Sequence, residues 1–139
     1  PDRVQVRKEW RMEGIAVPVL GFTDAEYDAH GLILDLKTTH ALPNAIRTSH
    51  ARQVASYVGA GSNMSGGVAY VTSKKSALYQ LENASAHIAA LTRMARSLQN
   101  FLAISTDPHE LASLITVDTD SLYLADPRAR QHAFDVFGV

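Results

Sequence analysis

The segment Leu32–Thr38, with the sequence LILDLKT, constrains the fold of this chain more than any other part of it. A short run rich in leucine and isoleucine is typical of a central β-strand. Because side chains alternate between the two faces of a strand, Ile33, Asp35 and Lys37 share one face. Burying charges is costly unless they are paired or bind a metal. The segment therefore carries either a structural ion pair or part of a functional site.

The remaining pattern predicts a single α/β domain over residues 1–139. Two strand-like segments before 32–38 suggest an antiparallel meander. A helix with Ser49 as its N-cap, a glycine-rich loop and two short strands follow. A long amphipathic helix and two short helices, which begin at Asp107-Pro108 and Asp126-Pro127, end the chain. The corresponding residues are 3–13 and 15–24 for the first strands, 25–31 for a polar turn, 49–58 for the helix, 59–67 for the loop, 68–72 and 77–81 for the short strands, and 83–104 for the long helix.

The composition limits the chemistry and the setting of the protein. The chain has no cysteine, which excludes disulfides and thiolate metal sites and fits a reducing cytoplasm. Thirteen Lys and Arg residues oppose fourteen Asp and Glu residues, a balance that argues against a nucleic-acid packaging protein. No apolar run is long enough to span a bilayer, so we expect a cytoplasmic protein without a membrane partner.

A second acid precedes the central strand. Asp24 lies eleven residues before Asp35, at the end of the preceding strand-like segment. If the two strands are antiparallel neighbours, these carboxylates approach each other, and close carboxylates raise a pKa or recruit a cation. Oxygen ligands suit Mg²⁺ or Mn²⁺, and the backbone carbonyl of Leu36 could supply a further oxygen.

These residues form part of a motif series that resembles the RecB-like branch of the PD-(D/E)xK nuclease superfamily. The series consists of a GxxD strand end, a DxK strand followed by hydroxylated residues, and a QxxxY helix. It covers roughly residues 9–82. The matching residues are Gly21-Phe22-Thr23-Asp24, Asp35-Leu36-Lys37-Thr38-Thr39, and Gln53 with Tyr57.

The resemblance implies a fold and a role for each matching residue. The expected fold is a restriction-endonuclease-like core, in which helices flank a central mixed β-sheet. Asp24 and Asp35 resemble the metal-binding carboxylates, and Lys37 resembles the catalytic lysine. The residues expected to contact DNA or to support the site are Gln53, Tyr57, His50 on the same helix face, and Thr38.

The expected function is Mg²⁺- or Mn²⁺-dependent hydrolysis of DNA, with an exonuclease favoured over an endonuclease. The setting would be phage or bacterial DNA replication or recombination, where a replication or recombination protein could be a further partner. A catalytically silent domain of the same fold, which binds DNA or holds an assembly, is the alternative. Many family members also carry an acid or a histidine on an upstream helix, which has no counterpart in residues 1–23. The nuclease domain expected over residues 1–139 could therefore lack this N-terminal helix. Glu9 is the candidate for an extra ligand, and a surface acid is the competing interpretation.

Overall fold

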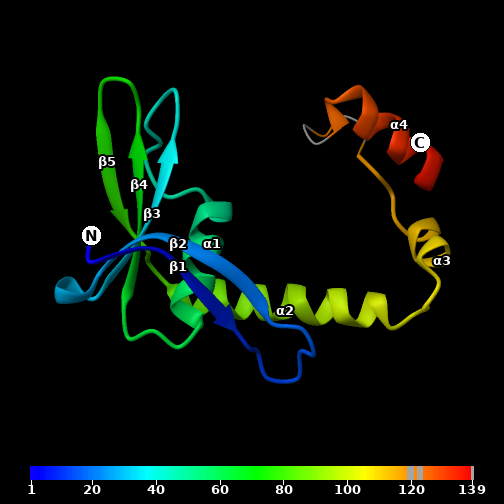
Figure 1. Cartoon of the computed structure of the whole chain (residues 1–139), viewed down its shortest axis with the longest axis horizontal. Coiled ribbons are helices and arrows are strands. Elements are labelled where there is room, and N and C mark those ends of the chain that lie inside the picture. Colours follow the sequence, from blue (N-terminus) through cyan, green and yellow to red (C-terminus); the bar gives the residue numbers. More distant parts are fainter. Residues whose placement is uncertain (119–120, 122–123, 139) are drawn as a thin grey trace. The chain divides into compact units, whose positions relative to one another are not determined.

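The computed structural model describes residues 1–118, 121 and 124–138. The chain forms two compact units, Pro1–Arg96 and Ser97–Val139. The first unit contains a mixed β-sheet and helix α1 (Thr48–Gly59), which together make an α/β fold (Figure 1). The single nuclease domain expected over residues 1–139 stays a prediction, and the sheet that carries its candidate site belongs to the first unit.

The sheet has the strand order β1-β2-β3-β4-β5. The first three strands form the antiparallel meander that the sequence predicts, and a short 3₁₀ helix, Asp28–His30, joins β2 to β3. Strand β4 lies parallel to β3, and α1 makes the crossover that such a pair requires. This topology is consistent with a restriction-endonuclease-like core, although other α/β proteins share these elements. The strands are β1 (Arg3–Trp10), β2 (Val19–Tyr27), β3 (Leu32–Thr38), β4 (Ser65–Val71) and β5 (Ser76–Gln80).

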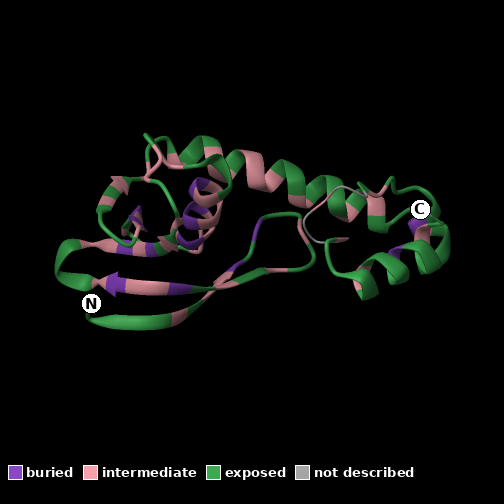
Figure 2. Cartoon of the chain, turned by 90° about the horizontal axis from the view of Figure 1, so that it is seen from above, coloured by how far each residue is buried: buried purple, intermediate pink, exposed green. Residues whose placement is uncertain are grey.

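The core lies between α1 and the sheet. Val54 of α1 packs with Val68 and Tyr70 of β4, and all three are almost completely buried. Figure 2 shows the buried residues of this unit on α1 and on the strands beside it. Burying a side chain of this size stabilises the fold by about 1.5–3 kcal/mol. The face of β3 that bears Ile33 and Asp35 is turned into this core, as the alternation of the strand predicts.

The expectation of a loop over residues 59–67 is wrong at its end, because β4 already begins at Ser65. The reason is the close approach of α1 to this strand. A Cβ atom on Gly66 would clash with Cγ1 of Val54, so only glycine fits beside the helix at this position. Gly66, which suggested a flexible loop, instead lets β4 pack closely against α1.

Two further boundaries differ from the sequence prediction. Helix α1 begins at Thr48 and has Arg47 as its N-cap, so Ser49 does not cap it. The Arg47 N–H donates instead to the hydroxyl of Tyr70 at 3.1 Å, a contact between distant parts of the chain. Strand β2 runs over Val19–Tyr27 rather than 15–24, and it therefore includes the first part of the expected polar turn.

The C-terminal elements are helical, as predicted. Helix α2 (Ala84–Leu102) has no buried residue along its described length (Figure 2). Helices α3 (Pro108–Ser113) and α4 (Pro127–Phe137) both begin with the predicted acid–proline caps. Asp107 accepts a hydrogen bond from His109 N at 2.9 Å, and Asp126 accepts one from Arg128 N at 2.8 Å. Within the described ranges, no helix combines the length and the apolar character that a membrane span requires.

Candidate functional site

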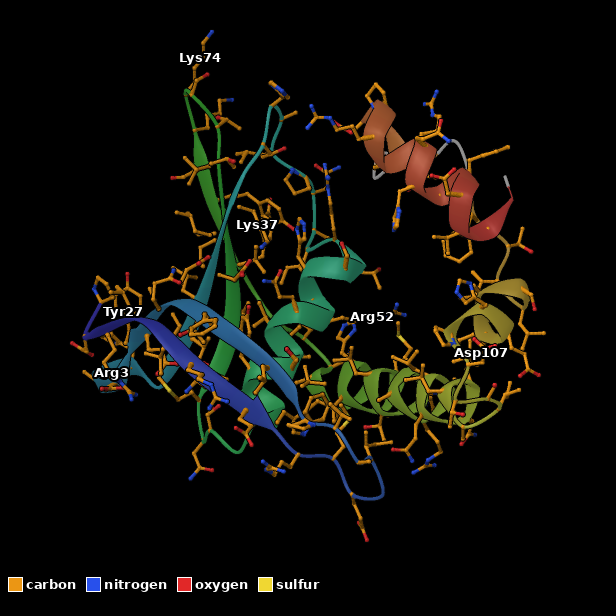
Figure 3. The ribbon with its side chains drawn as sticks, turned by 45° about the vertical axis from the view of Figure 1, so that its right-hand side comes forward. Arg3, Tyr27, Lys37, Arg52, Lys74 and Asp107 are labelled. Atoms are coloured by element: carbon orange, nitrogen blue, oxygen red, sulfur yellow. The ribbon has the colours of Figure 1, made fainter. Side chains whose placement is uncertain are left out.

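The candidate site is built around a buried ion pair on β3. Asp35 is 1% exposed, and the Lys37 ammonium lies 2.9 Å from its Oδ2 atom. No hydrogen bond from another described residue reaches that oxygen. Lys37 lies on the side of the sheet that α1 covers (Figure 3). The sequence prediction that the two charges share a desolvated strand face is therefore confirmed.

Asp24 reaches this ion pair from β2. Continuing the β2–β3 register by one residue beyond its last pair would place Asp24 opposite Asp35, and the ladder of paired residues stops there. The Asp24 Oδ2 atom instead accepts a hydrogen bond from the Leu36 backbone N–H at 2.7 Å. The carboxylate of Asp24 thus takes the place of a strand carbonyl, immediately beside the Asp35–Lys37 segment.

The strands are irregular around Asp24. Thr23 and Glu26 are both fully buried although they are three residues apart, so the normal alternation of β2 breaks between them. Gln5, at the opposing position of β1, has a φ of 50° and is missing from the β1–β2 pairing. Its Nε2 atom lies 3.4 Å from Asp24 Oδ1. Irregularities of this kind redirect side chains beside functional sites, and here they turn Asp24 toward β3.

Burial disfavours the ionised form of Asp35, and the charges around it act in both directions. Its burial raises the pKa of the carboxyl group, and the negative charge of Asp24 raises it further. The hydrogen bond and the positive charge of Lys37 act in the opposite direction. Asp35 thus has one ammonium partner and a second carboxylate near it, an imbalance that a bound cation would relieve.

The helix pair of the QxxxY motif packs over the same region. Gln53 Nε2 donates to the hydroxyl of Tyr57 at 2.9 Å, and Tyr57 is 5% exposed. Burial raises the pKa of Tyr57, and the charges of Asp35 and Asp24 raise it as well. A Cβ atom on Gly21 would lie only 2.7 Å from Cε1 of Tyr57. The glycine of GxxD and the tyrosine of QxxxY therefore form one close packing contact.

His50 lies at the start of the same helix. Its Nδ1 atom is 2.7 Å from the hydroxyl of Tyr70, and the two ring centroids are 5.6 Å apart. Burial lowers the pKa of His50, and the positive charge of Lys37 lowers it further, whereas Asp35 acts against this shift. Tyr70 was not predicted as a site residue. Its place in an apolar strand gives no signal, since only the fold brings its hydroxyl to His50.

Two of the predicted site residues are not brought to this centre. Glu9 pairs with Arg7 at 2.9 Å and with Arg11, and both arginines lower its pKa. It lies opposite Leu20, four residues from Asp24 along β2, a separation of about 13 Å. Thr38 is exposed and alternates to the sheet face opposite Lys37, so it does not line the site.

The sheet contains a second buried acid, which was not predicted from the sequence. Glu26 is fully buried on β2 and lies 2.9 Å from Arg3 and 2.8 Å from Lys8. The hydroxyl of Thr23 also donates to it at 3.0 Å. Its partners come from β1, more than fifteen residues earlier in the chain. The pattern of alternation could not reveal it, because the irregularity at Asp24 changes the phase of the strand.

The donor atoms at Asp24 and Asp35 fit a magnesium or manganese ion better than a zinc ion. The described part of the chain contains no cluster of three or more His, Cys, Asp or Glu side chains that could hold a metal. Mg²⁺, however, keeps several waters and is usually bound through one or two carboxylates. Because the N–H and C=O of one strand residue face the same neighbour, the Leu36 carbonyl is directed toward the edge that Asp24 occupies.

Comparison with known proteins supports the fold. No protein-family model matches the chain, and no curated protein sequence matches it. The crystal structure of SSO0001 is similar, with a TM-score of 0.54 and 22% identity. The match covers 70% of this chain and 50% of SSO0001, so the chain spans about half the length of that protein. At this identity the likeness shows the α/β fold alone.

Proposed function

We propose that Asp24, Asp35 and Lys37 form the active site of a Mg²⁺- or Mn²⁺-dependent deoxyribonuclease of the RecB-like PD-(D/E)xK branch. The observation that supports this proposal is the buried Asp35, which has a second carboxylate nearby and a single ammonium partner. The negative charge of Asp24 does not stabilise the Asp35–Lys37 ion pair, because it raises the pKa of Asp35. A centre that binds a cation requires this additional negative charge.

Each residue of the site has a distinct task in this proposal. Asp24, Asp35 and the Leu36 carbonyl would hold the ion, which when bound polarises a phosphate oxygen and lowers the pKa of water. Lys37 contributes a fixed positive charge, held in place by Asp35, where negative charge grows on the scissile phosphate. One such electrostatic contact is typically worth about 10²–10³ in rate.

The α1 residues support substrate binding. The hydrogen bond between Gln53 and Tyr57 fixes both side chains on the helix face beside Asp35. The remaining side-chain N–H of Gln53 can donate to a phosphate oxygen of the DNA backbone. DNA is thus the proposed partner, and we favour an exonuclease over an endonuclease. A replication or recombination protein of a phage or bacterium would be the further partner.

The direct test is cleavage of end-labelled linear DNA by the full chain with Mn²⁺ or Mg²⁺. We expect Asp35→Ala and Lys37→Ala each to lower the rate at least about 100-fold while the circular dichroism spectrum stays native. Lys74→Ala is the charge-matched control, because Lys74 is exposed at the tip of the β4–β5 hairpin (Figure 3). Equal cleavage by the native chain and both site variants would refute the proposal. A covalently closed circular substrate separates the two modes, since an exonuclease needs an end.

One observation favours a catalytically silent domain as the second candidate. Asp24 Oδ2 is already used as the acceptor of the Leu36 N–H, which leaves fewer free carboxylate lone pairs for an ion. A silent domain would bind DNA or hold an assembly together without cutting. It would retain DNA in a mobility-shift experiment and leave linear DNA intact with either metal.

A further inference from the structure

The buried hydroxyl of Tyr70 connects the start of α1 with the candidate site. Tyr70 is 1% exposed and lies on β4, directly opposite Lys37 in the parallel register. Its hydroxyl oxygen is 3.1 Å from Arg47 N and 2.7 Å from His50 Nδ1. Both contacts come from the first turn of α1, so the strand residue fixes the helix start and the orientation of the imidazole together.

The proton on the Tyr70 hydroxyl decides which tautomer His50 adopts. The Arg47 backbone N–H can only donate, so the Tyr70 oxygen accepts from it. If His50 Nδ1 also donated, the Tyr70 proton would have no hydrogen-bond acceptor among the described residues. An unsatisfied buried donor is unfavourable. The favoured arrangement therefore has Tyr70 donating to an unprotonated Nδ1, which places the ring proton of neutral His50 on Nε2.

The His50 Nε2–H group is available for a ligand. No hydrogen bond joins Nε2 to any residue in the part of the chain that the structure describes. The charged groups that act on the ring are Lys37, Asp35 and Arg47. Two of these are cations, so an anionic oxygen in front of the ring would meet a favourable potential. Burial and Lys37 lower the pKa of His50, which helps to keep the ring neutral and the tautomer defined.

We propose that Tyr70 is a positioning residue that holds His50 as the Nε2–H tautomer, and that His50 donates this proton in a hydrogen bond to a phosphate oxygen of bound DNA. The inference rests on the proposed function, since it assigns the ligand of the same site. A phosphodiester oxygen only accepts hydrogen bonds, so it matches a neutral imidazole N–H and the ammonium of Lys37 on the same face. The tautomer of His50 and its hydrogen bond to phosphate can each be tested without measuring cleavage.

The tautomer is tested by long-range ¹H–¹⁵N NMR on the full chain. The chain has six histidines, and the spectrum of His50→Gln identifies the signals of His50. We expect a pyridine-type Nδ1 signal and a pyrrole-type Nε2 signal at neutral pH. In Tyr70→Phe the ring should shift toward a mixture of tautomers, because the hydroxyl donor is gone. A pyrrole-type Nδ1 in the native chain would overturn the proposal.

The phosphate contact is tested by the affinity for a short labelled DNA duplex in EDTA, where no cleavage occurs. We expect His50→Ala to weaken binding about 10-fold, as for the loss of one hydrogen bond to a charged acceptor. His50→Gln should restore most of it, because its Nε2 can replace the imidazole Nε2–H, whereas His50→Asn should not. Ser49→Ala, which changes an exposed neighbour, is the matched control. Unchanged affinity in His50→Ala would remove the contact, whether or not the native chain cuts DNA.

Discussion

Two buried carboxylates in one sheet differ in the number of their cationic partners. Glu26 is neutralised by Arg3 and Lys8 and receives a hydrogen bond from Thr23. Asp35 has a single cationic partner, Lys37, and a second acid beside it. Both side chains are almost completely hidden from solvent. Burial alone therefore does not distinguish them, whereas the balance of charge around each one does.

The difference separates a structural acid from a candidate functional acid. A fully paired buried carboxylate holds two strands in register, and its cost of desolvation is offset by its partners. A buried carboxylate with too few partners needs another source of positive charge to offset its cost of burial, and a divalent cation would supply it. Glu26 thus shows what the Asp35 region would look like if its role were structural.

The largest effect we predict concerns Glu26. Glu26→Gln should lower the free energy of unfolding by about 3 kcal/mol, because Lys8, with a side chain 16% exposed, loses its acid. Urea unfolding measures this change. Asp28→Asn, which removes the exposed acid paired with Arg3, should cost less than about 1 kcal/mol. DNA cleavage per folded molecule should survive in both variants, and its loss in Glu26→Gln would break the comparison.

A smaller effect is expected at Gly21, which neighbours Lys8, a partner of Glu26, and Tyr57, which is near Asp35. Gly21 is paired with Lys8 across the strands, and Tyr57 packs on its open side. Gly21→Ala should cost about 1–2 kcal/mol, because the ring of Tyr57 must move away from the new methyl group. A double-mutant cycle with Tyr57→Ala measures the coupling by thermal unfolding. Additive effects would show that the glycine serves some other purpose.

The smallest effect has the opposite sign and belongs to Asp35. Because its folded pKa is raised, the native state binds this proton more tightly than the unfolded state, and stability falls as pH rises through the folded pKa. Asp35→Asn does not titrate. In EDTA we therefore expect the variant to gain stability relative to the native chain as pH rises, beginning above about pH 4, the ordinary Asp pKa, and complete above the raised value. Thermal melts across pH measure the difference in stability between Asp35→Asn and the native chain. The prediction is contradicted if this difference does not grow with pH, or if it falls.

Local patterns were sufficient to predict much of the sheet and the acid at its centre. The bounds of β3 and the burial of Asp35 follow from a short leucine-rich segment with alternating faces, in which Asp35 and Lys37 are the only charged residues. The starts of α3 and α4 follow from Asp107 and Asp126, because an acid before a proline satisfies the first helical N–H groups locally. These features depend on residues that are neighbours in the chain.

What the sequence could not show depends on contacts between distant residues. Gly66 is in a strand because Val54 of α1 leaves no space for a side chain. The hydroxyl of Tyr70 fixes the start of α1, and the register of β1 with β2 gives Glu26 its partners. The same register holds Glu9 with Arg7 and Arg11, far along the strand from Asp24. No local pattern encodes such distances.

The central claim is that the Asp24–Asp35–Lys37 site lacks one positive charge that a divalent cation supplies. Isothermal titration of the full chain with Mn²⁺ tests it most directly, with Glu26→Gln and Asp35→Asn as the matched pair. We predict binding by the native chain and by Glu26→Gln, and at least about a 10-fold loss of affinity in Asp35→Asn, because second carboxylates contribute strongly to such sites. Equal Mn²⁺ affinity in the native chain and Asp35→Asn would contradict the account.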